Sequence, residues 1–262
     1  MAALAIDASP FTVRVGIMGC ASIARKNARA IIRSERCTLV AVASRERQKA
    51  EAFCSELDLE TSCTIRMVEG YDALLAYEGI DAVYIPLPTK LHKEWVSKAA
   101  AAGKHILVEK PVGVNAAEVQ EMIVDCRAGG VALMDGTMFV HHRRFKQIDR
   151  LFADTTWQPK RVTSAFTFAA PIEFLAGGNI RTNGMDPLGC LGDVGWYCIR
   201  FGMAAFKSKP AYVRARVREA TDGGVPTDMD CDVSFSRGDP KRTVLSPRLL
   251  TFHCSFCVGI RL

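Results

Sequence analysis

The chain has 262 residues, of which 49% are hydrophobic and 24% are charged, and this composition is typical of a globular protein and excludes a disordered one. The length allows one large domain or two modest ones with a sizeable core. The net charge of +6 is mild and the Lys and Arg residues are scattered, so the sequence does not indicate a nucleic-acid partner.

Signals for export or membrane insertion are not evident in the sequence. No apolar run approaches the ~20 residues that cross a bilayer. Residues 1–10 contain Asp7 and no basic region, which argues against a secretory signal. The ten cysteines lack the regular spacing of a disulfide framework. We therefore expect a protein of a reducing compartment, the cytoplasm, without a membrane partner.

The first half of the chain alternates apolar strand patterns with helical patterns. Strands are predicted at residues 12–18, 38–43, 64–68, 82–85, 106–108 and 131–134. Helices are predicted at residues 22–33, 45–57, 71–77, 90–102 and 115–127. Asn115 is the expected N-cap of the last helix, because Glu118 follows it by three residues. Short links between alternating strands and helices favour a parallel sheet covered on both faces, ending near residue 136.

The second half changes character. A strand is predicted over residues 161–169, and a Gly-interrupted amphipathic helix over residues 187–206. Residues 212–220 and 229–236 alternate polar and apolar side chains, as half-exposed antiparallel strands do. Residues 249–257 also resemble a strand. The pattern predicts a second, α+β domain built on an open sheet.

Residues 13–24 have the form strand, Gly-x-x-Gly, small residue, helix. Gly16 and Gly19 would let the backbone turn tightly and approach a pyrophosphate, and the helix from Ser22 offers free N–H groups to the phosphates. The full dinucleotide fingerprint has a third glycine where this chain has Ala21. The alternative is a glycine turn in an α/β protein that binds no nucleotide.

The end of the second strand indicates which dinucleotide is bound. An NAD-binding enzyme usually has an acidic residue there, to accept from the ribose 2′-hydroxyl. This chain has Ser44 and Arg45, and a hydroxyl with a guanidinium suits a 2′-phosphate. The sequence thus favours NADP over NAD, although Arg45 and Arg47 alternatively just begin a solvated helix.

The apolar strand 106–108 ends abruptly in Glu109, Lys110 and Pro111. Ligands bind beyond the carboxyl ends of the strands of an open parallel sheet, so Lys110 is expected beside a cofactor. Taken alone, the tripeptide is equally consistent with an ordinary surface lysine followed by a turn proline.

Several His and Cys residues are of metal-ligand type, and none is expected to bind a metal ion. Cys254 and Cys257 form a single C-x-x-C without a second pair. His141 and His142 are adjacent, and adjacent residues of a helix do not face each other. His105 lies in a predicted strand and is expected to be structural.

Six stretches together resemble the glucose–fructose oxidoreductase/inositol dehydrogenase (Gfo/Idh/MocA) family, in the branch of dimeric dihydrodiol dehydrogenase, NADP-dependent D-xylose dehydrogenase and their plant relatives. The matching stretches are residues 16–24, 43–45, 84–92, 109–111, 134–138 and 192–197. The resemblance implies an α/β protein: an N-terminal Rossmann domain with a doubly wound parallel sheet (residues 1–136), then a substrate-binding α+β domain (residues 137–262). The second domain would have an open, mainly antiparallel sheet.

The resemblance also implies roles for individual residues. Those expected to bind NADP are Gly16, Gly19, Cys20, Ala21, Ser22, Ile23, Ser44, Arg45, Pro86, Leu87, Pro88, Thr89, His92, Glu109 and Lys110. In the family, the lysine matching Lys110 is catalytic and its bond to the following proline is often cis. The positions of Asp193 and Tyr197 face the substrate, and Phe139 and Trp196 are expected to line it. The sugar and dihydrodiol enzymes often have Trp at the position of Phe139, so that stacking contact is in question.

These residues predict an NADP-dependent oxidoreductase that transfers hydride between the nicotinamide and a carbinol of a sugar, polyol or dihydrodiol. Asp193 and Tyr197 are four residues apart, on one face of a helix. A phenol with a pKa of about 10 is a poor base, but a lysine cation beside it lowers that pKa. We expect Tyr197 to be the acid/base, Lys110 its electrostatic partner and Asp193 the orienting residue. In the nearest variant, Lys110 takes the proton itself.

The chain departs from the family near its C-terminus, where family members are generally longer. The expectation is a shortened, truncated second domain, which leaves the homodimer of the family in question. The alternative function is therefore a catalytically silent NADP-binding product with a regulatory role or none.

Overall fold

The computed structural model describes residues 12–57, 64–154, 156, 159–235 and 248–256, and the chain divides into two units. The first unit contains residues up to Leu87, then Leu91–Glu109 and Asn115–Asp135. The second contains Pro88–Lys90, Lys110–Val114 and the residues from Gly136 onward. The chain thus passes into the second unit shortly after two strands of the first.

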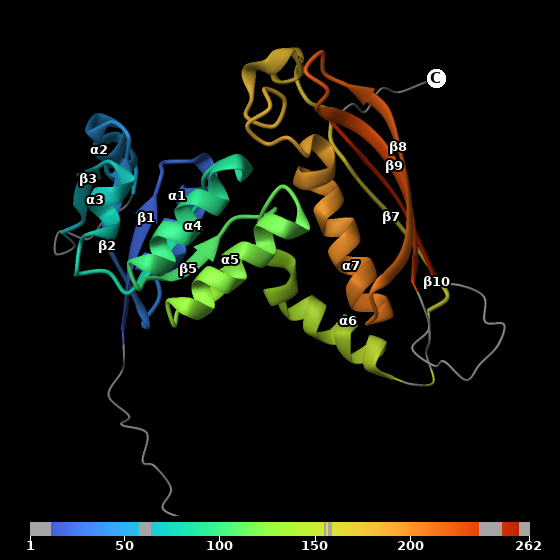
Figure 1. The fold of residues 1–262 in the computed structure, drawn as a ribbon, viewed down its shortest axis with the longest axis horizontal. Helices are drawn as coiled ribbons and strands as arrows, with labels where there is room; N and C mark the ends of the chain where they lie inside the picture. The colour runs from blue at the N-terminus through green and yellow to red at the C-terminus, as the bar shows by residue number, and fades with distance from the viewer. Residues whose placement is uncertain (1–11, 58–63, 155, 157–158, 236–247, 257–262) are drawn as a thin grey trace, which may run out of the picture. The chain divides into compact units, whose positions relative to one another are not determined.

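The first unit is built on a six-stranded parallel sheet in the order β3-β2-β1-β4-β5-β6 (Figure 1). Its strands are β1 (Val13–Met18), β2 (Cys37–Ser44), β3 (Arg66–Glu69), β4 (Ala82–Ile85), β5 (His105–Val108) and β6 (Leu133–Asp135). This order is that of a doubly wound dinucleotide-binding sheet, in which the strand order reverses beside β1.

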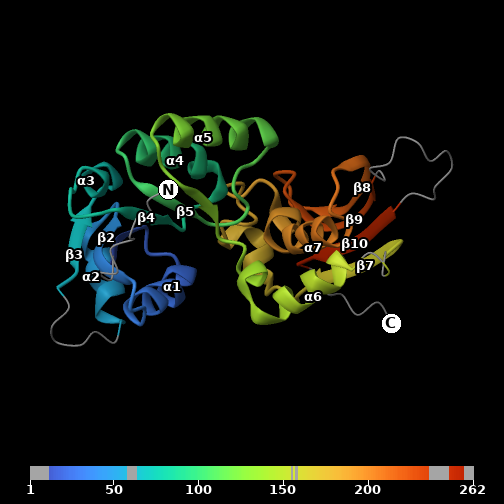
Figure 2. The same ribbon diagram turned by 90° about the horizontal axis from the view of Figure 1, so that it is seen from below.

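Helices cover both faces of this sheet (Figure 2). They are α1 (Ser22–Ile32), α2 (Arg47–Ser55), α3 (Tyr71–Leu75), α4 (His92–Ala101) and α5 (Ala116–Ala128), with a 3₁₀ turn η1 (Thr89–Leu91) before α4. Small residues of α1, Ala24 and Ala28, pack with Ile17 and Val42 of the sheet in one buried cluster. The side chain of Asn115 accepts from the Glu118 N–H, which confirms the predicted cap.

The second unit has a four-stranded mixed sheet in the order β7-β10-β9-β8. The strands are β7 (Arg161–Thr167), β8 (Pro210–Ala220), β9 (Pro226–Phe235) and β10 (Arg248–Ser255). Strand β10 is parallel to β7 and antiparallel to β9, and β9 is antiparallel to β8. The predicted α/β fold with a second, open sheet is confirmed.

One long helical segment covers the inner face of the second sheet (Figure 1). It begins with a π-helical turn, η4 (Leu191–Gly195), and continues as α7 (Trp196–Phe206). It packs mainly over β7, β9 and β10, where Leu250, Phe252 and Cys254 are buried in one core cluster. The wide turn occurs where the sequence has Gly192 and Gly195, and such turns are common at functional sites.

Three features of the second unit differ from the prediction. A helix, α6 (Arg143–Ala153), follows a 3₁₀ turn, η2 (Met138–His141), in a stretch for which no element was predicted. A second π-helical turn, η3 (Phe174–Gly178), was also not predicted. Strand β8 was expected to be half buried, yet all eleven of its residues are exposed, because β8 lies at the edge of the sheet beyond the helix.

Candidate active site

The glycine turn after β1 has the geometry that a phosphate-binding turn requires. Gly19 has φ +106°, a conformation that favours glycine, and a Cβ there would lie 2.9 Å from Cδ2 of Leu87. Helix α1 starts directly after the turn. Within the described part of the chain, no side chain caps its N-terminus and its first turn has no acidic residue. Its N–H groups and positive dipole end therefore face a place suited to an anion.

The residues at the end of β2 lie beside this turn. Ser44 is buried, and its Oγ accepts from the Glu46 N–H at 3.4 Å. The Cys20 thiol hydrogen-bonds to Ser44, and burial raises the pKa of Cys20. Arg45 is exposed. The structure thus brings the predicted Ser44 next to the glycine turn and leaves Arg45 accessible to a ligand.

His92 holds the segment that the resemblance assigns to the nicotinamide side. It is buried, and its Nε2 lies 2.8 Å from the carbonyl oxygen of Leu87. The Leu87 side chain in turn packs against Gly19. His92 therefore contributes by positioning the backbone after β4 within the first unit.

Glu109, which directly follows β5, belongs to a hydrogen-bonded chain that the sequence did not predict. The Tyr84 hydroxyl donates to Glu109 Oε1 at 2.6 Å, and Asn27 Nδ2 donates to the Tyr84 oxygen at 2.5 Å. Burial, and then the charge of Glu109, raise the pKa of Tyr84. The sequence held one signal for this chain of hydrogen bonds, namely Tyr84 inside a strand predicted to be buried. A buried phenol usually needs a hydrogen-bond partner.

Lys110, the first residue of its segment in the second unit, makes a partly buried ion pair with Asp193. Its Nζ donates to Asp193 Oδ1 and to the Asp193 backbone oxygen, both at 2.7 Å. The Lys110–Pro111 peptide is cis, as the resemblance implies. The side chains of Lys110 and Asp193 are only 12% and 14% exposed, so water screens the pair weakly.

A second cation, Arg181, also contacts the Asp193 carboxylate, and the sequence did not predict it. Its Nε lies 2.9 Å from Asp193 Oδ2. Burial alone would raise the pKa of Asp193, but the charges and hydrogen bonds of Lys110 and Arg181 hold this pKa below its ordinary value. Asp193 is therefore a largely buried, charged carboxylate between two cations.

The loop that contains Arg181 also contacts the segment after β4. Asp186 Oδ1 accepts from the Thr89 N–H at 2.6 Å, and the Met185 carbonyl accepts from the Lys90 N–H at 3.2 Å. The predicted residues Pro88 and Thr89 thus belong to the same unit as Lys110.

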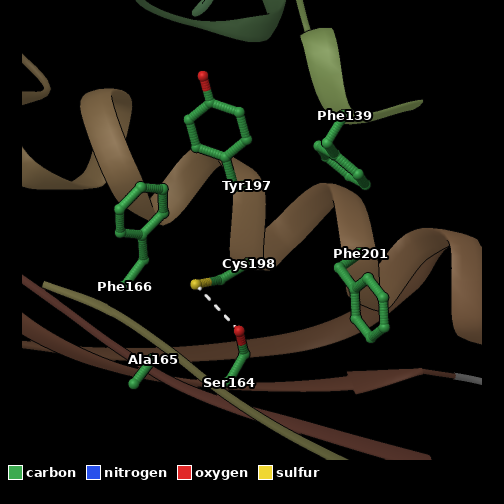
Figure 3. A pocket seen from close by; sticks show the side chains of 7 residues that line it. All are labelled: Phe139, Ser164, Ala165, Phe166, Tyr197, Cys198 and Phe201. Carbon is green, nitrogen blue, oxygen red and sulfur yellow. Dashed lines mark hydrogen bonds between the residues drawn. The ribbon is translucent and has the colours of Figure 1, made fainter. Parts of the chain in front are cut away.

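Tyr197 stands next to the ion pair. Lys110 Nζ lies 5.2 Å from the centre of its ring. The ring lines an open cavity of about 290 Å³ whose other lining residues are Phe139, Ser164, Ala165, Phe166, Cys198 and Phe201. Figure 3 shows the Tyr197 ring between Phe166 and Phe139, with its hydroxyl pointing away from Ser164 and Cys198. The second unit thus brings Lys110, Asp193, Tyr197 and Phe139 together.

Trp196 and the histidines lie elsewhere. Trp196 does not line this cavity, and its Nε1 donates to Thr137 Oγ1 at 2.8 Å. His142 caps α6 by accepting from the Arg144 N–H, and His105 Nδ1 accepts from the Ala132 N–H.

The described residues contain neither a metal-binding cluster nor a membrane-spanning helix. Residues 12–57, 64–154, 156, 159–235 and 248–256 contain no group of three His, Cys, Asp or Glu side chains placed to hold a metal ion. Cys257 of the C-x-x-C lies outside these residues. No helix in the same residues is long and apolar enough to cross a membrane.

Comparison with known proteins identifies the family. The model of an oxidoreductase family with an NAD-binding Rossmann fold, GFO/IDH/MocA, matches residues 13–137. D-xylose 1-dehydrogenase (NADP(+)) 2 of Haloferax volcanii is 33% identical over 87% of this chain and 67% of its own length. A dTDP-3,4-didehydro-2,6-dideoxy-α-D-glucose 3-reductase of Actinomadura kijaniata is 34% identical over 81% of this chain. This chain spans 62% of the length of that reductase.

A solved structure matches both units. The 3-ketoreductase KijD10 of Actinomadura kijaniata, in complex with NADP and TDP-benzene, aligns with a TM-score of 0.77 and 29% identity. The alignment covers 94% of this chain and 70% of KijD10. The family model, the xylose dehydrogenase and this structure agree, and the chain belongs to the GFO/IDH/MocA oxidoreductase family.

Proposed function

We propose that the protein is an NADP-dependent oxidoreductase that transfers hydride between the nicotinamide and a carbinol of a sugar, polyol or dihydrodiol. The observation that supports this most is the group formed by Lys110, Asp193 and Tyr197. Lys110 is the second residue after β5 of a dinucleotide-binding sheet. In this proposal, residues 1–136 bind NADP and residues 137–262 bind the substrate.

The first unit has the features that a dinucleotide needs. The turn at Gly16 and Gly19 and the uncapped start of α1 from Ser22 would hold the pyrophosphate. Ser44 and Arg45 would hold the 2′-phosphate, which is the basis for NADP in preference to NAD. The segment from Pro86 to Thr89, with His92 and Glu109, would line the nicotinamide. When bound, the nicotinamide accepts or donates the hydride.

Tyr197 is the proposed acid/base. In the oxidation direction, the substrate loses a hydride from carbon and a proton from its hydroxyl, and the phenolate oxygen of Tyr197 takes that proton. The Lys110 ammonium stabilises the negative charge on the phenolate, and Asp193 and Arg181 hold the ammonium in place. The nearest variant, in which Lys110 takes the proton, uses the same residues.

The relatives support this assignment. The Haloferax volcanii relative is an NADP-dependent xylose dehydrogenase, and the Actinomadura kijaniata structures contain NADP and a TDP ligand. Variants of KijD10 that replace one lysine and one tyrosine also match this chain. These substitutions affect the two residue types that stand together here as Lys110 and Tyr197.

A cytoplasmic location completes the proposal. The eight cysteines among the described residues are free thiols. The sulfur atoms of Cys190 and Cys254 lie 3.8 Å apart without a bond, as a reducing compartment allows.

A second candidate is a catalytically silent NADP-binding protein, and the exposure of β8 favours it. All residues of the edge strand β8 are exposed, whereas natural proteins usually cover or protect such an edge. Both candidates predict a thermal shift with NADPH that exceeds the shift with NADH, and only the first predicts turnover of a polyol panel.

Tyr197→Phe tests the proposed chemistry directly. We expect kcat to fall by about 10²–10⁴-fold, because the phenyl ring cannot exchange a proton, while NADPH affinity stays unchanged. Steady-state kinetics and NADPH titration measure the two quantities. Unchanged turnover would remove Tyr197 from its role.

A further inference from the structure

Tyr71, the first residue of α3, places its hydroxyl beside the glycine turn of the first unit. A Cβ on Gly19 would lie 3.5 Å from the Tyr71 hydroxyl oxygen. The Gly19 N–H donates to the Ala43 carbonyl oxygen at 2.8 Å. The Gly70 N–H donates to the Ser44 carbonyl oxygen, also at 2.8 Å. The end of β2 therefore holds both the glycine turn and the residue that precedes Tyr71.

The ring of Tyr71 is fixed by α4. Its centre lies 5.0 Å from that of Trp95, and the two rings are almost perpendicular, at 88°. Lys98 Nζ lies 4.1 Å from the centre of the Trp95 ring and pairs with Glu94 at 3.0 Å, so the Trp95 ring is covered in turn. These contacts give the Tyr71 side chain one defined position beside Gly19.

The Tyr71 hydroxyl is a hydrogen-bond donor that the rest of the first unit does not use. Among the residues that the structure describes, none makes a hydrogen bond with it. The Tyr84 hydroxyl, by contrast, has two partners. Burial raises the pKa of Tyr71, and the positive charge of Arg45 offsets this only in part. The phenol therefore keeps its proton at neutral pH and can donate it in a hydrogen bond.

The place beside Gly19 favours an anion whose oxygens accept hydrogen bonds. Helix α1 begins at Ser22, and its first turn contains no acidic residue. The N–H groups at its start and the Tyr71 hydroxyl are all donors, and phosphate oxygens are acceptors only. A phosphate group there would satisfy both kinds of donor, and the hydrogen bond from the phenol would be charge-assisted.

We propose that Tyr71 is a further cofactor-binding residue, whose hydroxyl donates a hydrogen bond to a pyrophosphate oxygen of the dinucleotide. This inference rests on the cofactor binding of the proposed function and adds a contact from α3 that the glycine motif does not include. NADP and NAD have the same pyrophosphate. Tyr71 therefore contributes equally to the affinity for both, whereas Arg45 distinguishes between them.

Tyr71→Phe tests the proposal, because it removes the hydroxyl and keeps the ring against Trp95. We expect Kd for NADPH and Kd for NADH to rise by a similar factor of at least about tenfold, as measured by isothermal titration calorimetry. Tyr77→Phe is the matched control and should keep both wild-type values. Tyr77 is also half-buried and follows α3, but its ring faces Arg66 at 4.8 Å. An unchanged melting temperature without ligand verifies that each variant is folded.

Two fragments of the cofactor locate the contact. ADP has a pyrophosphate and no 2′-phosphate, and 2′-AMP has a 2′-phosphate and no pyrophosphate. In competition with NADPH, Tyr71→Phe should weaken the binding of ADP by at least about tenfold and leave that of 2′-AMP unchanged. Arg45→Glu should have the reverse effect. Equal weakening of the two fragments by Tyr71→Phe, or weakening of 2′-AMP alone, would overturn the assignment to the pyrophosphate.

Binding and turnover together separate this inference from the proposed function. If Tyr71→Phe keeps the wild-type Kd for both dinucleotides, the role of Tyr71 is overturned and cofactor binding remains. If the wild-type chain binds neither dinucleotide, both are overturned. Binding that depends on Tyr71 as expected, in a chain that oxidises no alcohol, would support the role of Tyr71 and contradict the oxidoreductase activity alone.

Discussion

At the scale of single residues, the charge of Asp193 is the feature that organises the candidate site. A buried carboxylate is costly unless it is paired and hydrogen-bonded. Here Lys110 and Arg181 contact its two oxygens, and the Asp193 backbone carbonyl accepts a further bond from Lys110. These contacts fix the Lys110 ammonium over the ring of Tyr197. A mobile lysine side chain would be solvated by water and would stabilise a phenolate less.

Replacing Asp193 by Asn should destabilise the second unit in a pH-dependent way. The pKa of Asp193 is lower in the folded chain than in the unfolded chain, so its charged form stabilises the fold above about pH 4, the ordinary range of Asp. This contribution is lost as the pH falls through the folded-state pKa. We expect a deficit of about 1–3 kcal/mol for Asp193→Asn near neutral pH, because Lys110 and Arg181 lose their counter-charge.

Urea unfolding at several pH values measures this deficit. The difference between wild type and Asp193→Asn should stay constant from about pH 7 to about pH 5 and shrink as the pH is lowered from about 4 to about 2. Asp222→Asn, at an exposed turn residue of the same unit, is the control and should leave the free energy of unfolding unchanged at each pH. A deficit that is constant over the whole range would show that the carboxylate charge is not its cause.

Cofactor preference is also decided by single residues. Arg45→Glu should raise KM for NADP⁺ by at least about tenfold and affect NAD⁺ little, because a charge-assisted contact to the 2′-phosphate is worth about 1.5–3 kcal/mol. Arg47→Glu is the matched control, since Arg47 already pairs with Glu51 at 2.9 Å. Initial rates with both cofactors check the expectation. Equal effects of the two substitutions would assign the selectivity to general surface charge.

Residue-scale prediction from the sequence succeeded where neighbours in the chain define the position. The glycine turn and Lys110 both follow apolar strands, so their positions beyond the carboxyl ends of these strands could be predicted. Arg181 and Asn27 were missed because their partners, Asp193 and Tyr84, are distant in the sequence and only the tertiary fold brings them together.

At the scale of elements, the π-helical turn η4 determines how the Lys110–Pro111 segment meets α7. A Cβ on Gly192 would lie 2.7 Å from Leu188 Cβ and 3.1 Å from Pro111 Cγ. Only glycine allows this close approach, because a Cβ would force Leu188 to move and would also press on Pro111. The same turn contains Asp193, so η4 provides both the space for Pro111 and the ion-pair partner of Lys110.

Gly192→Ala should therefore impair catalysis without affecting the cofactor unit. We expect kcat to fall at least about tenfold, because displacing Pro111 also shifts Lys110 and small displacements of catalytic groups are costly. Overpacking should also cost about 1–3 kcal/mol of stability. NADPH titration should give the wild-type affinity, and steady-state kinetics measures the loss.

The control for this prediction is Gly223→Ala. Gly223 lies in the turn between β8 and β9, and a Cβ there would have only Thr221 Oγ1 nearby, at 3.8 Å. It should keep wild-type kcat. If Gly192→Ala keeps it as well, the close approach of Pro111 does not matter for the reaction.

Elements were predictable from periodicity in the first unit and less so in the second. Most strands of the parallel sheet are largely apolar runs, with β3 (Arg66–Glu69) as the exception, and the residues between them repeat with the period of a helix. Helix α6 was missed because its surface is strongly basic, although Phe145, Ile148 and Phe152 have helical spacing. The exposure of β8 could not be predicted. The alternation of polar and apolar residues shows which side chains share a face of the strand, but not whether another element packs on that face.

At the scale of the whole molecule, the chain passes between its two units five times, at residues 87/88, 90/91, 109/110, 114/115 and 135/136. The last of these points lies one residue before the boundary expected between residues 136 and 137, which stays a prediction. The others arise because the residues after β4 and β5 are held by loop 179–186 and by Asp193 in the second unit. Site residues that are adjacent in the sequence, Glu109 and Lys110, thus belong to different units.

The open edge of the second sheet is the other feature of the whole molecule. On β8, Val213 and Val217 are 57% and 52% exposed, and they pair with Val233 and Met229 of β9, which are buried. The apolar inner face of the sheet thus continues onto an edge strand that the helix does not cover. Exposed apolar edge strands favour association between molecules.

We therefore expect the protein to self-associate through β8, and Val213→Lys with Val217→Lys to suppress this association, because charged side chains on an edge strand oppose strand pairing. Light scattering and size-exclusion chromatography from about 1 to 100 µM should show a mass that rises with concentration in the wild type and stays monomeric in the double variant. Val124→Lys is the matched control, since Val124 is 52% exposed on α5 of the other unit and should leave association unchanged. A wild-type chain that stays a single species of constant mass over this range would contradict the role assigned to β8.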